Sequence, residues 1–250
     1  MLTLSNVATG YGKKQIASGL SATLKQGELV AMLGPNGCGK STLLRTLAGL
    51  QPALSGSVRC GAQSLSHYDP RTLAQTISIV LTQRTEAEAL TVSDVVNMGR
   101  IPYAQMLRRS SQADRLAVSR AMQLTQVQAF SHRPLQSLSD GERQRVFIAK
   151  SLAQDTPIIL LDEPTAFLDF ATKVHTLRLL RQLAHQQQKA ILLSTHDVEL
   201  ALHLCDTLWL LHTDGITVGT PQQLAQQGAI STFFQSESIH FNVPQMRFEY

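Results

Sequence analysis

Two groups of residues in this sequence have the types and spacing that phosphate chemistry needs. The first is the stretch GPNGCGKST at residues 34–42, which lies between an apolar run and a helix-forming run. Glycines let consecutive backbone N–H groups converge on a phosphate, and the start of the following helix adds a positive field. This pattern predicts a nucleoside triphosphate site, with Lys40 at the β and γ phosphates and the Ser41 hydroxyl on Mg²⁺. The expected binding residues are Asn36, Gly37, Cys38, Gly39, Lys40, Ser41 and Thr42.

The second group is a pair of acids, Asp162 and Glu163, directly after the apolar run at residues 158–161. A strand buried on both faces has little reason to end in two carboxylates unless they meet a cation or a water, because unpaired buried charge is costly. We expect Asp162 to hold Mg²⁺ and Glu163 to polarise the attacking water. General-base catalysis of this kind typically contributes ~10²–10⁴-fold.

Three further polar residues stand where apolar strands are expected to stop, namely Gln83, Asp169 and His196. Each alone is an ordinary loop residue. Together they indicate a ligand site, because open α/β sheets bind ligands at the carboxyl ends of their parallel strands.

The elements that must position these residues are strands and helices in alternation. Strand patterns run through residues 1–33, begin again at Val58 and at Ile77, and return at 158–161, 190–193 and 208–211, with helical stretches at 171–187 and 198–204. Residues 86–153 have helical spacing throughout. We therefore predict an α/β fold: a P-loop NTPase core with a mostly parallel sheet, an N-terminal antiparallel β subdomain and an inserted all-helical subdomain.

The same pattern predicts a single domain over residues 1–250. Residues 1–85 and 156–220 would form the core with its β subdomain, 86–155 the helical subdomain, and 221–250 a polar, Gln-rich tail.

Composition limits the class of protein. Hydrophobic residues make up 43% of the 250 residues and charged residues 16%, which excludes intrinsic disorder. The net charge is +4, but the basic residues are scattered, so we expect no nucleic-acid partner. Cys38, Cys60 and Cys205 form no CxxC pair and favour a reducing compartment. No apolar run approaches the roughly 18 residues of a membrane span, so any membrane role would need another chain.

The stretch LSDGERQRV at residues 138–146 completes a set of motifs that resembles a known family. Together with the glycine-rich stretch, Gln83, ILLDEPTAFLD (159–169) and STHD (194–197), it is similar to the nucleotide-binding subunit of an ATP-binding cassette transporter. The resemblance implies an ATPase that works as a homodimer. Ser139, Gly141 and Glu142 of one copy would meet the nucleotide held by the other, while Lys40, Ser41, Gln83, Asp162, Glu163 and His196 act in cis, with Gln83 both catalytic and on Mg²⁺. Tyr11 matches the aromatic residue that stacks on adenine.

The sequence departs from the family pattern at three positions. Asp140 replaces a glycine, Glu142 commonly a glutamine, and Phe167 a small or polar residue. Two acids near the γ-phosphate of the other copy could weaken closure by repulsion. Alternatively, both carboxylates favour the helix N-terminus and point away from phosphate.

The stretch TVSDVVNMGRIPY at residues 91–103 resembles the equivalent segment of importers of iron-siderophore, haem or cobalamin type. The simpler interpretation is a capped amphipathic helix with Val92, Val95, Val96 and Gly99 packed inward. If the importer resemblance holds, the surface between Gln83 and Tyr103 would dock membrane-spanning permease subunits at the cytoplasmic face of the inner membrane. A periplasmic or surface binding protein would then deliver the ligand, and charged substitutions at Gly99 or Tyr103 would uncouple the ATPase from the permease.

Other functions stay open at this stage. A single-cassette ATPase of cofactor assembly or an importer ATPase for another substrate would share these motifs. A GTPase or small-molecule kinase is disfavoured, because no NKxD motif is present and the 138–146 segment would have no role.

Overall fold

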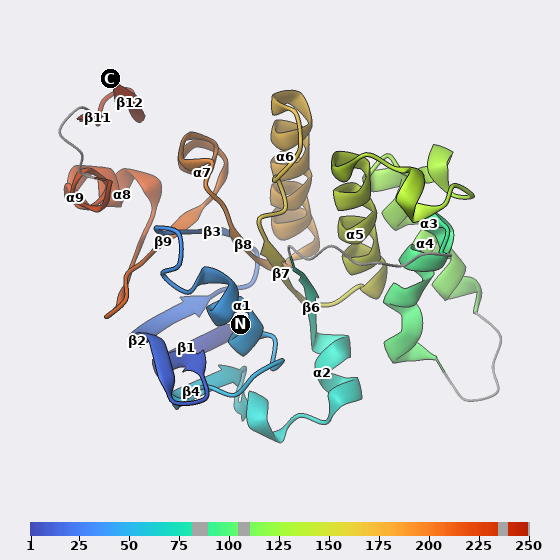
Figure 1. The fold of residues 1–250 in the computed structure, drawn as a ribbon, viewed down its shortest axis with the longest axis horizontal. Coiled ribbons are helices and arrows are strands. Elements are labelled where there is room, and N and C mark those ends of the chain that lie inside the picture. The colour runs from blue at the N-terminus through green and yellow to red at the C-terminus, as the bar shows by residue number, and fades with distance from the viewer. Residues whose placement is uncertain (82–89, 105–110, 235–239, 250) are drawn as a thin grey trace.

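A computed structural model describes residues 1–81, 90–104, 111–234 and 240–249. Its centre is a six-stranded sheet in the order β10-β9-β3-β8-β7-β6, in which β9, β3, β8, β7 and β6 are mutually parallel and β10 is antiparallel (Figure 1). The strands are β3 Leu29–Leu33, β6 Ile77–Val80, β7 Ile158–Asp162, β8 Ala190–Ser194, β9 Thr207–Leu211 and β10 Ile216–Gly219.

The sheet forms because its central strands are short apolar runs that must be covered on both faces. Every residue of β3, β7 and β8 is buried. One face packs on α1 (Lys40–Leu47) and the N-terminal strands, and the other on α6 (Phe170–Gln187) and α7 (Val198–Leu204). All parallel strands therefore end at one edge, where the loops that follow β3, β7 and β8 meet.

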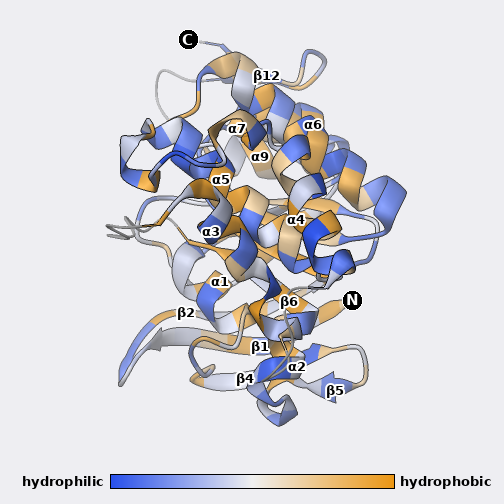
Figure 2. Ribbon diagram, turned by 90° about the vertical axis from the view of Figure 1, so that its right-hand side faces the viewer, coloured by the Kyte–Doolittle hydropathy of each residue, from blue (hydrophilic) through white to orange (hydrophobic). Residues whose placement is uncertain are grey.

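The N-terminal strands form a separate four-stranded antiparallel sheet in the order β2-β1-β4-β5. These strands are β1 Leu2–Tyr11, β2 Lys14–Leu24, β4 Ser55–Cys60 and β5 Gln63–Ser64, followed by η1 Leu65–His67 and α2 Pro70–Thr76. In Figure 2 this sheet lies below the rest of the molecule. Its role for the site is to carry Tyr11 at the end of β1.

The described residues between 90 and 154 are helical and have a hydrophobic core of their own, which includes Val92, Val96, Val118 and Val146. The elements are α3 Val92–Asn97, η2 Met98–Tyr103, α4 Gln112–Leu124, η3 Gln128–Phe130, η4 Leu135–Ser137 and α5 Asp140–Gln154. They lie together on the right in Figure 1, beyond β6.

The tail is more ordered than its polar sequence suggests. It forms α8 Pro221–Gln226, α9 Ala229–Phe233 and a hairpin of β11 His240–Asn242 and β12 Arg247–Glu249. Leu224 and Ile230 are buried against the core, and edge-to-face contacts join His212 to Phe233 and Phe234 to Phe248. A cavity of about 730 Å³ lies between α9 and the loop after β3.

The predicted α/β class is confirmed, with the mostly parallel sheet, the antiparallel N-terminal sheet and the helical insertion all present. We keep the division at 1–85, 86–155, 156–220 and 221–250 as a proposal. The inward packing of Val92, Val95, Val96 and Gly99 is also confirmed. The idea that a charged Gly99 would act only on a docking surface is wrong, because a Cβ there would lie 2.4 Å from the Lys150 carbonyl oxygen.

Candidate functional site

The glycine loop, residues 34–42, turns the chain sharply between β3 and α1. Gly37 and Gly39 have φ values of 78° and 105°, in the left-handed region that residues with a Cβ rarely adopt. Pro35, Asn36 and Gly37 are exposed, whereas Cys38, Gly39 and Lys40 are buried. The loop therefore presents its backbone to solvent at the edge of the sheet.

Lys40 is held inside this loop. Its Nζ donates to the carbonyl oxygens of Gly34 at 2.8 Å and Pro35 at 3.1 Å, and only 6% of the residue is exposed. Ser41 and Thr42 follow in the first turn of α1, which contains no acidic residue. The ammonium group and the positive end of α1 thus lie in the same turn, which is an arrangement that attracts a multiply charged anion.

Asp162 lies at the end of β7, two strands away from the glycine loop. The residue is 4% exposed, and its Oδ1 accepts a 2.7 Å hydrogen bond from Ser194 Oγ of β8. Ser194 Oγ in turn accepts a 2.9 Å hydrogen bond from the Glu163 backbone N–H. Ser194 therefore fixes both acids, a role that sequence reasoning did not assign to it.

Glu163 follows β7 and His196 follows the neighbouring strand β8, and their side chains are in contact. Glu163 Oε1 lies 2.8 Å from His196 Nε2, and the side chains remain 32% and 46% exposed. Glu163 has a φ of 48°, an unusual value for a non-glycine residue and one often found at functional sites. A carboxylate in this half-exposed position can reach a water and is oriented by the imidazole.

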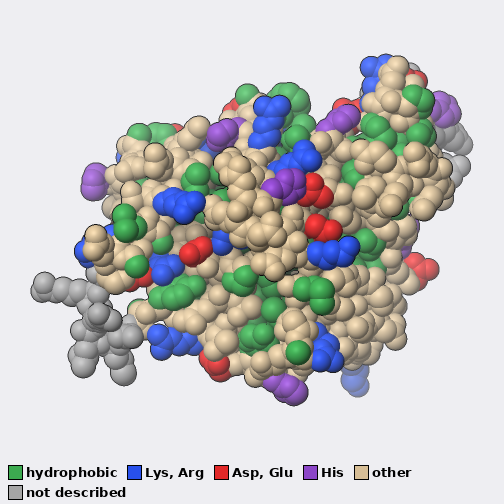
Figure 3. Space-filling view, turned by 180° about the vertical axis from the view of Figure 1, so that it is seen from behind, with side chains coloured by type: hydrophobic (Ala, Val, Ile, Leu, Met, Phe, Trp, Pro, Cys, Tyr) green, Lys and Arg blue, Asp and Glu red, His purple; other side chains and the backbone are tan. Residues whose placement is uncertain are grey.

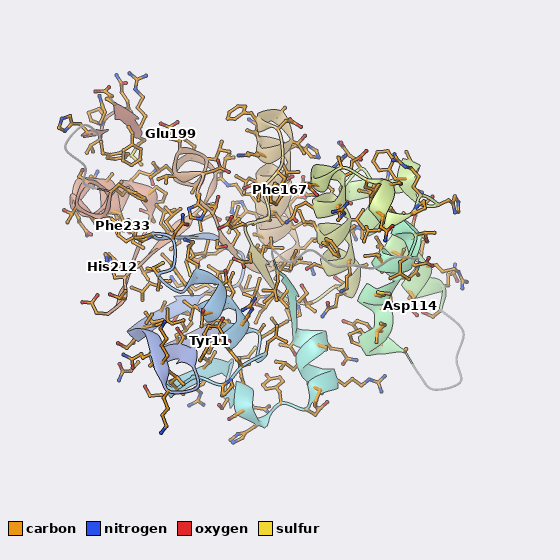
Figure 4. All side chains as sticks on the ribbon, viewed as in Figure 1. Tyr11, Asp114, Phe167, Glu199, His212 and Phe233 are labelled. Atoms are coloured by element: carbon orange, nitrogen blue, oxygen red, sulfur yellow. The ribbon has the colours of Figure 1, made fainter. Side chains whose placement is uncertain are left out.

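Tyr11 lies beside the glycine loop although it comes from the other sheet (Figure 4). Its hydroxyl accepts hydrogen bonds from Arg45 Nη1 at 2.9 Å and from Thr42 Oγ1 at 3.3 Å. The bond from Thr42, followed by Arg45, lowers the pKa of the phenol. The tyrosine is 49% exposed, so it can accept a planar group next to the loop.

Ser139 and Glu142 form a capping box at the start of α5. Glu142 Oε2 accepts from the Ser139 N–H at 2.8 Å and from Ser139 Oγ at 3.0 Å, while Ser139 Oγ accepts from the Glu142 N–H. These bonds, aided by Arg133 and Arg145, lower the pKa of Glu142. Asp140 pairs with Arg143 at 3.1 Å. Of the two alternatives for these acids, the structure therefore favours capping of the helix.

The predicted residues form two groups within one chain. The glycine loop, Asp162, Glu163 and His196 lie along the edge formed by the ends of β3, β8 and β7, and Tyr11 contacts Thr42 at the start of α1. Ser139, Gly141 and Glu142 lie at the start of α5, on the far side of β6 in Figure 1. Gln83 lies outside the described residues. A single copy thus does not bring Ser139 to Lys40.

Comparison with known proteins agrees with this geometry. Residues 17–166 match the family model described as ABC transporter. The achromobactin transport ATP-binding protein CbrD of Dickeya dadantii is 35% identical over 234 residues, covering 93% of this chain and 87% of that protein. The ferric enterobactin transport ATP-binding protein FepC of Escherichia coli is 34% identical over 226 residues, covering 90% and 83%.

A solved structure has the same fold. The dimeric, post-hydrolysis state of the ATP-binding cassette MJ0796 bound to ADP and Pi is 26% identical, with a TM-score of 0.78, and the match covers 88% of this chain and 99% of that one. The chain belongs to the ABC transporter family. It is an ATP-binding cassette and an ATPase, as the motifs predicted.

Proposed function

We propose that this chain is the ATP-hydrolysing subunit of an ABC importer and that it works as a homodimer. The observation that carries the proposal is the separation of the site into two incomplete parts. Lys40 and Glu163 lie at the sheet edge, whereas Ser139 lies at the start of a helix beyond β6. Two copies arranged head to tail would join each glycine loop to the Ser139 helix of the other.

Each residue near the nucleotide has a chemical role in this proposal. Lys40 and the loop N–H groups bind the β and γ phosphates, and Tyr11 stacks on adenine. Glu163, held by His196, polarises the water that attacks the γ-phosphorus. Gly141 and the Ser139 hydroxyl of the second copy cover the γ-phosphate, and Glu142 keeps that helix start in shape.

The residues present also fit Mg²⁺. The Ser41 hydroxyl and the Asp162 carboxylate are oxygen ligands of the kind that Mg²⁺ prefers, and Gln83 would join them. Among the residues that the structure describes, no group of three His, Cys, Asp or Glu could hold an ion by itself, which agrees with a metal shared with phosphate oxygens. When bound, Mg²⁺ neutralises charge that develops on the phosphates.

Mixing two inactive variants tests the composite site. Lys40→Ala damages the glycine loop and Ser139→Arg damages the covering helix, so each homodimer should lose ATP turnover. A mixed dimer has one doubly damaged site and one intact site, and we expect turnover to reappear on mixing. Full activity in either homodimer would contradict the proposal, as would mixtures that stay inactive although heterodimers form.

The importer assignment rests on the relatives and on the segment at 91–103. CbrD and FepC are named for achromobactin and ferric enterobactin transport. In the described residues no helix has the length and apolar character of a membrane span. We therefore propose that integral permease subunits hold this chain at the cytoplasmic face of the inner membrane, and that a periplasmic or surface binding protein supplies an iron-siderophore, haem or cobalamin type ligand.

The charge distribution gives no support to a nucleic-acid partner. On the face shown in Figure 3, Lys and Arg are dispersed among Asp, Glu and His rather than gathered in one field. Affinity purification of the chain from membranes tests the importer assignment. We expect a multi-span permease to be recovered with it. Recovery of a soluble assembly complex alone would instead favour the cofactor-assembly class of cassette.

A further inference from the structure

The position of Tyr11 in the chain does not by itself fix the direction of its ring. Tyr11 is the last residue of β1 and pairs with Lys14 across the turn to β2. The pairing of the two strands is irregular between Leu4 and Gly10, and about half of the tyrosine is exposed. A side chain at such a hairpin end has several rotamers open to it unless another group holds it.

Two donors from α1 hold the Tyr11 hydroxyl. Arg45 lies in the last turn of this helix, and its Nη1 donates a hydrogen bond of 2.9 Å to the phenol oxygen. Thr42 Oγ1 donates a longer bond of 3.3 Å to the same oxygen. The shorter of the two bonds therefore comes from a charged donor, and hydrogen bonds from charged donors are stronger than those between neutral groups.

The same end of α1 also holds the backbone beside Tyr11. Gln51, shortly after the helix, donates from Nε2 to Thr46 Oγ1 at 3.1 Å and to the Gly10 carbonyl oxygen at 3.4 Å. The end of β1 is thus attached to α1 through its backbone and through the phenol. The ring of Tyr11 cannot turn away without breaking a hydrogen bond to the helix.

The attachment point lies at a useful distance from the phosphate loop. Arg45 follows Lys40 by five residues, which is about 7.5 Å along a helix axis at 1.5 Å per residue. A nucleotide with its β phosphate at Lys40 has its α phosphate and ribose next, and its base lies beyond them. The ring is therefore held on the side of the loop where a base would arrive.

The role of Arg45 follows from this geometry and rests on the proposed function, in which the Tyr11 ring stacks on adenine. A recognition group contributes most when it is ordered before the ligand binds, because its conformational freedom is then not lost on binding. We propose that Arg45 is a positioning residue for base recognition, which acts on the nucleotide only through the Tyr11 hydroxyl.

A double-mutant cycle on ADP binding tests this proposal. ADP is the probe because the proposed function expects it to leave the chain monomeric, so the affinity is measured without dimer formation. Arg45→Ala and Tyr11→Phe each remove one end of the hydrogen bond, and each should weaken ADP binding by about fivefold. The double variant should show the same loss of about fivefold, because Tyr11→Phe has already removed the group through which Arg45 acts.

Inorganic pyrophosphate separates positioning from a direct effect of charge. Pyrophosphate has two phosphates like ADP but no base, so Arg45→Ala should bind it as the parent does. An arginine that attracted phosphate directly would instead raise the Kd for ADP and for pyrophosphate together. Arg178→Ala, which removes an exposed arginine on α6, is the matched control and should bind both probes like the parent.

The ionisation of the phenol reports the contact itself. The hydrogen bonds from Thr42 and Arg45 lower the pKa of Tyr11, whereas burial raises the pKa of Tyr68 and Tyr103. Tyr11 should therefore ionise first of these three, and Arg45→Ala should raise its pKa because a donor that favours the phenolate is lost. Spectrophotometric titration measures this, with Tyr11→Phe to assign the first step. An unchanged pKa in Arg45→Ala would contradict the contact.

The outcomes distinguish this inference from the proposed function. If Tyr11→Ala weakens ADP binding but Arg45→Ala does not, the positioning role is wrong and stacking on Tyr11 stands. The same conclusion follows if the double variant loses the product of the two single losses, or if Arg45→Ala binds pyrophosphate more weakly than the parent. If Tyr11→Ala binds ADP like the parent, the stacking assigned to Tyr11 falls, and the role of Arg45 falls with it.

Discussion

Glu163 Oε1 lies 2.8 Å from His196 Nε2, and this contact joins the ends of two neighbouring parallel strands. Ser194 stabilises this arrangement, because its hydroxyl accepts a hydrogen bond from the Glu163 N–H and donates one to Asp162. The end of β8 therefore holds Glu163 at two points, its backbone N–H through Ser194 and its carboxylate through His196.

Removal of His196 should impair turnover more than binding. In His196→Ala the Glu163 carboxylate loses its orienting partner, whereas Lys40 and the glycine loop are untouched. We expect kcat to fall by about 10²-fold or more, with ATP affinity changed less than about threefold. Steady-state ATPase rates and equilibrium ATP binding measure the two quantities. His203→Ala, an exposed histidine on α7, should behave as the parent, and equal loss in both variants would refute the role of His196.

Glu142→Gln should strengthen the ATP-bound dimer. Glutamine can still accept from the Ser139 N–H and keep the helix start, but it removes a negative charge that competes for the Ser139 hydroxyl. We expect dimer dissociation to slow by about threefold to tenfold in a Glu163→Gln background, with thermal stability nearly unchanged. A weaker dimer at equal stability would mean that the charge of Glu142 assists closure.

Asp114 should make the stability of the helical part depend on pH. Its carboxylate accepts from the N–H and Oγ of Ser111 and from Arg100 Nε, and these hydrogen bonds lower its pKa from 3.8 to about 2. Since the folded pKa lies below the unfolded one, the stabilisation is complete above about pH 4 and is lost as the pH falls toward 2.

Asp114→Asn should therefore lower the free energy of unfolding by about 1 kcal/mol at pH 7, because solvent screens part of the interaction of this partly exposed carboxylate. The difference from the parent should shrink as the pH approaches 2. Denaturant unfolding at several pH values measures it, with the exposed Asp214→Asn as control. A constant difference across this range would show that the charge of Asp114 is not the cause.

Substitutions at Gly99 and Ile101 should distinguish a role of the 91–103 segment in internal packing from a role in docking the permease. Gly99→Val places a side chain against the backbone of α5 and should destabilise the protein by about 1–3 kcal/mol. Ile101 is 65% exposed, so Ile101→Glu should leave stability and ATP affinity unchanged but reduce recovery of the permease. Thermal melting and co-purification distinguish the two effects. Undiminished permease recovery in Ile101→Glu would remove this face from the docking surface.

The glycine loop and the carboxylate pair could be located from the sequence because each directly follows a short, uninterrupted run of apolar residues that predicts a buried strand. Sequence reasoning missed α2 because that helix buries none of its residues, although Asp69 accepting from two backbone N–H groups, followed by Pro70, is a local sign of a helix start. The tail was missed for a similar reason, since few apolar residues interrupt its polar sequence.

The role of Ser194 could not be predicted, because it depends on register. Asp162 pairs with Ser194 across β7 and β8, and only tertiary structure sets which residues lie opposite one another. The capping role of Glu142 was one of two alternatives in the sequence, and side-chain geometry was needed to choose between them.

The most direct test of the account is the mass and nucleotide content of Glu163→Gln protein with ATP and Mg²⁺. Light scattering after size exclusion, with quantification of bound nucleotide, should show a dimer with two ATP molecules, and ADP in place of ATP should leave a monomer. A monomer that holds ATP at all protein concentrations, with Ser139 making no contribution to binding, would contradict the composite site.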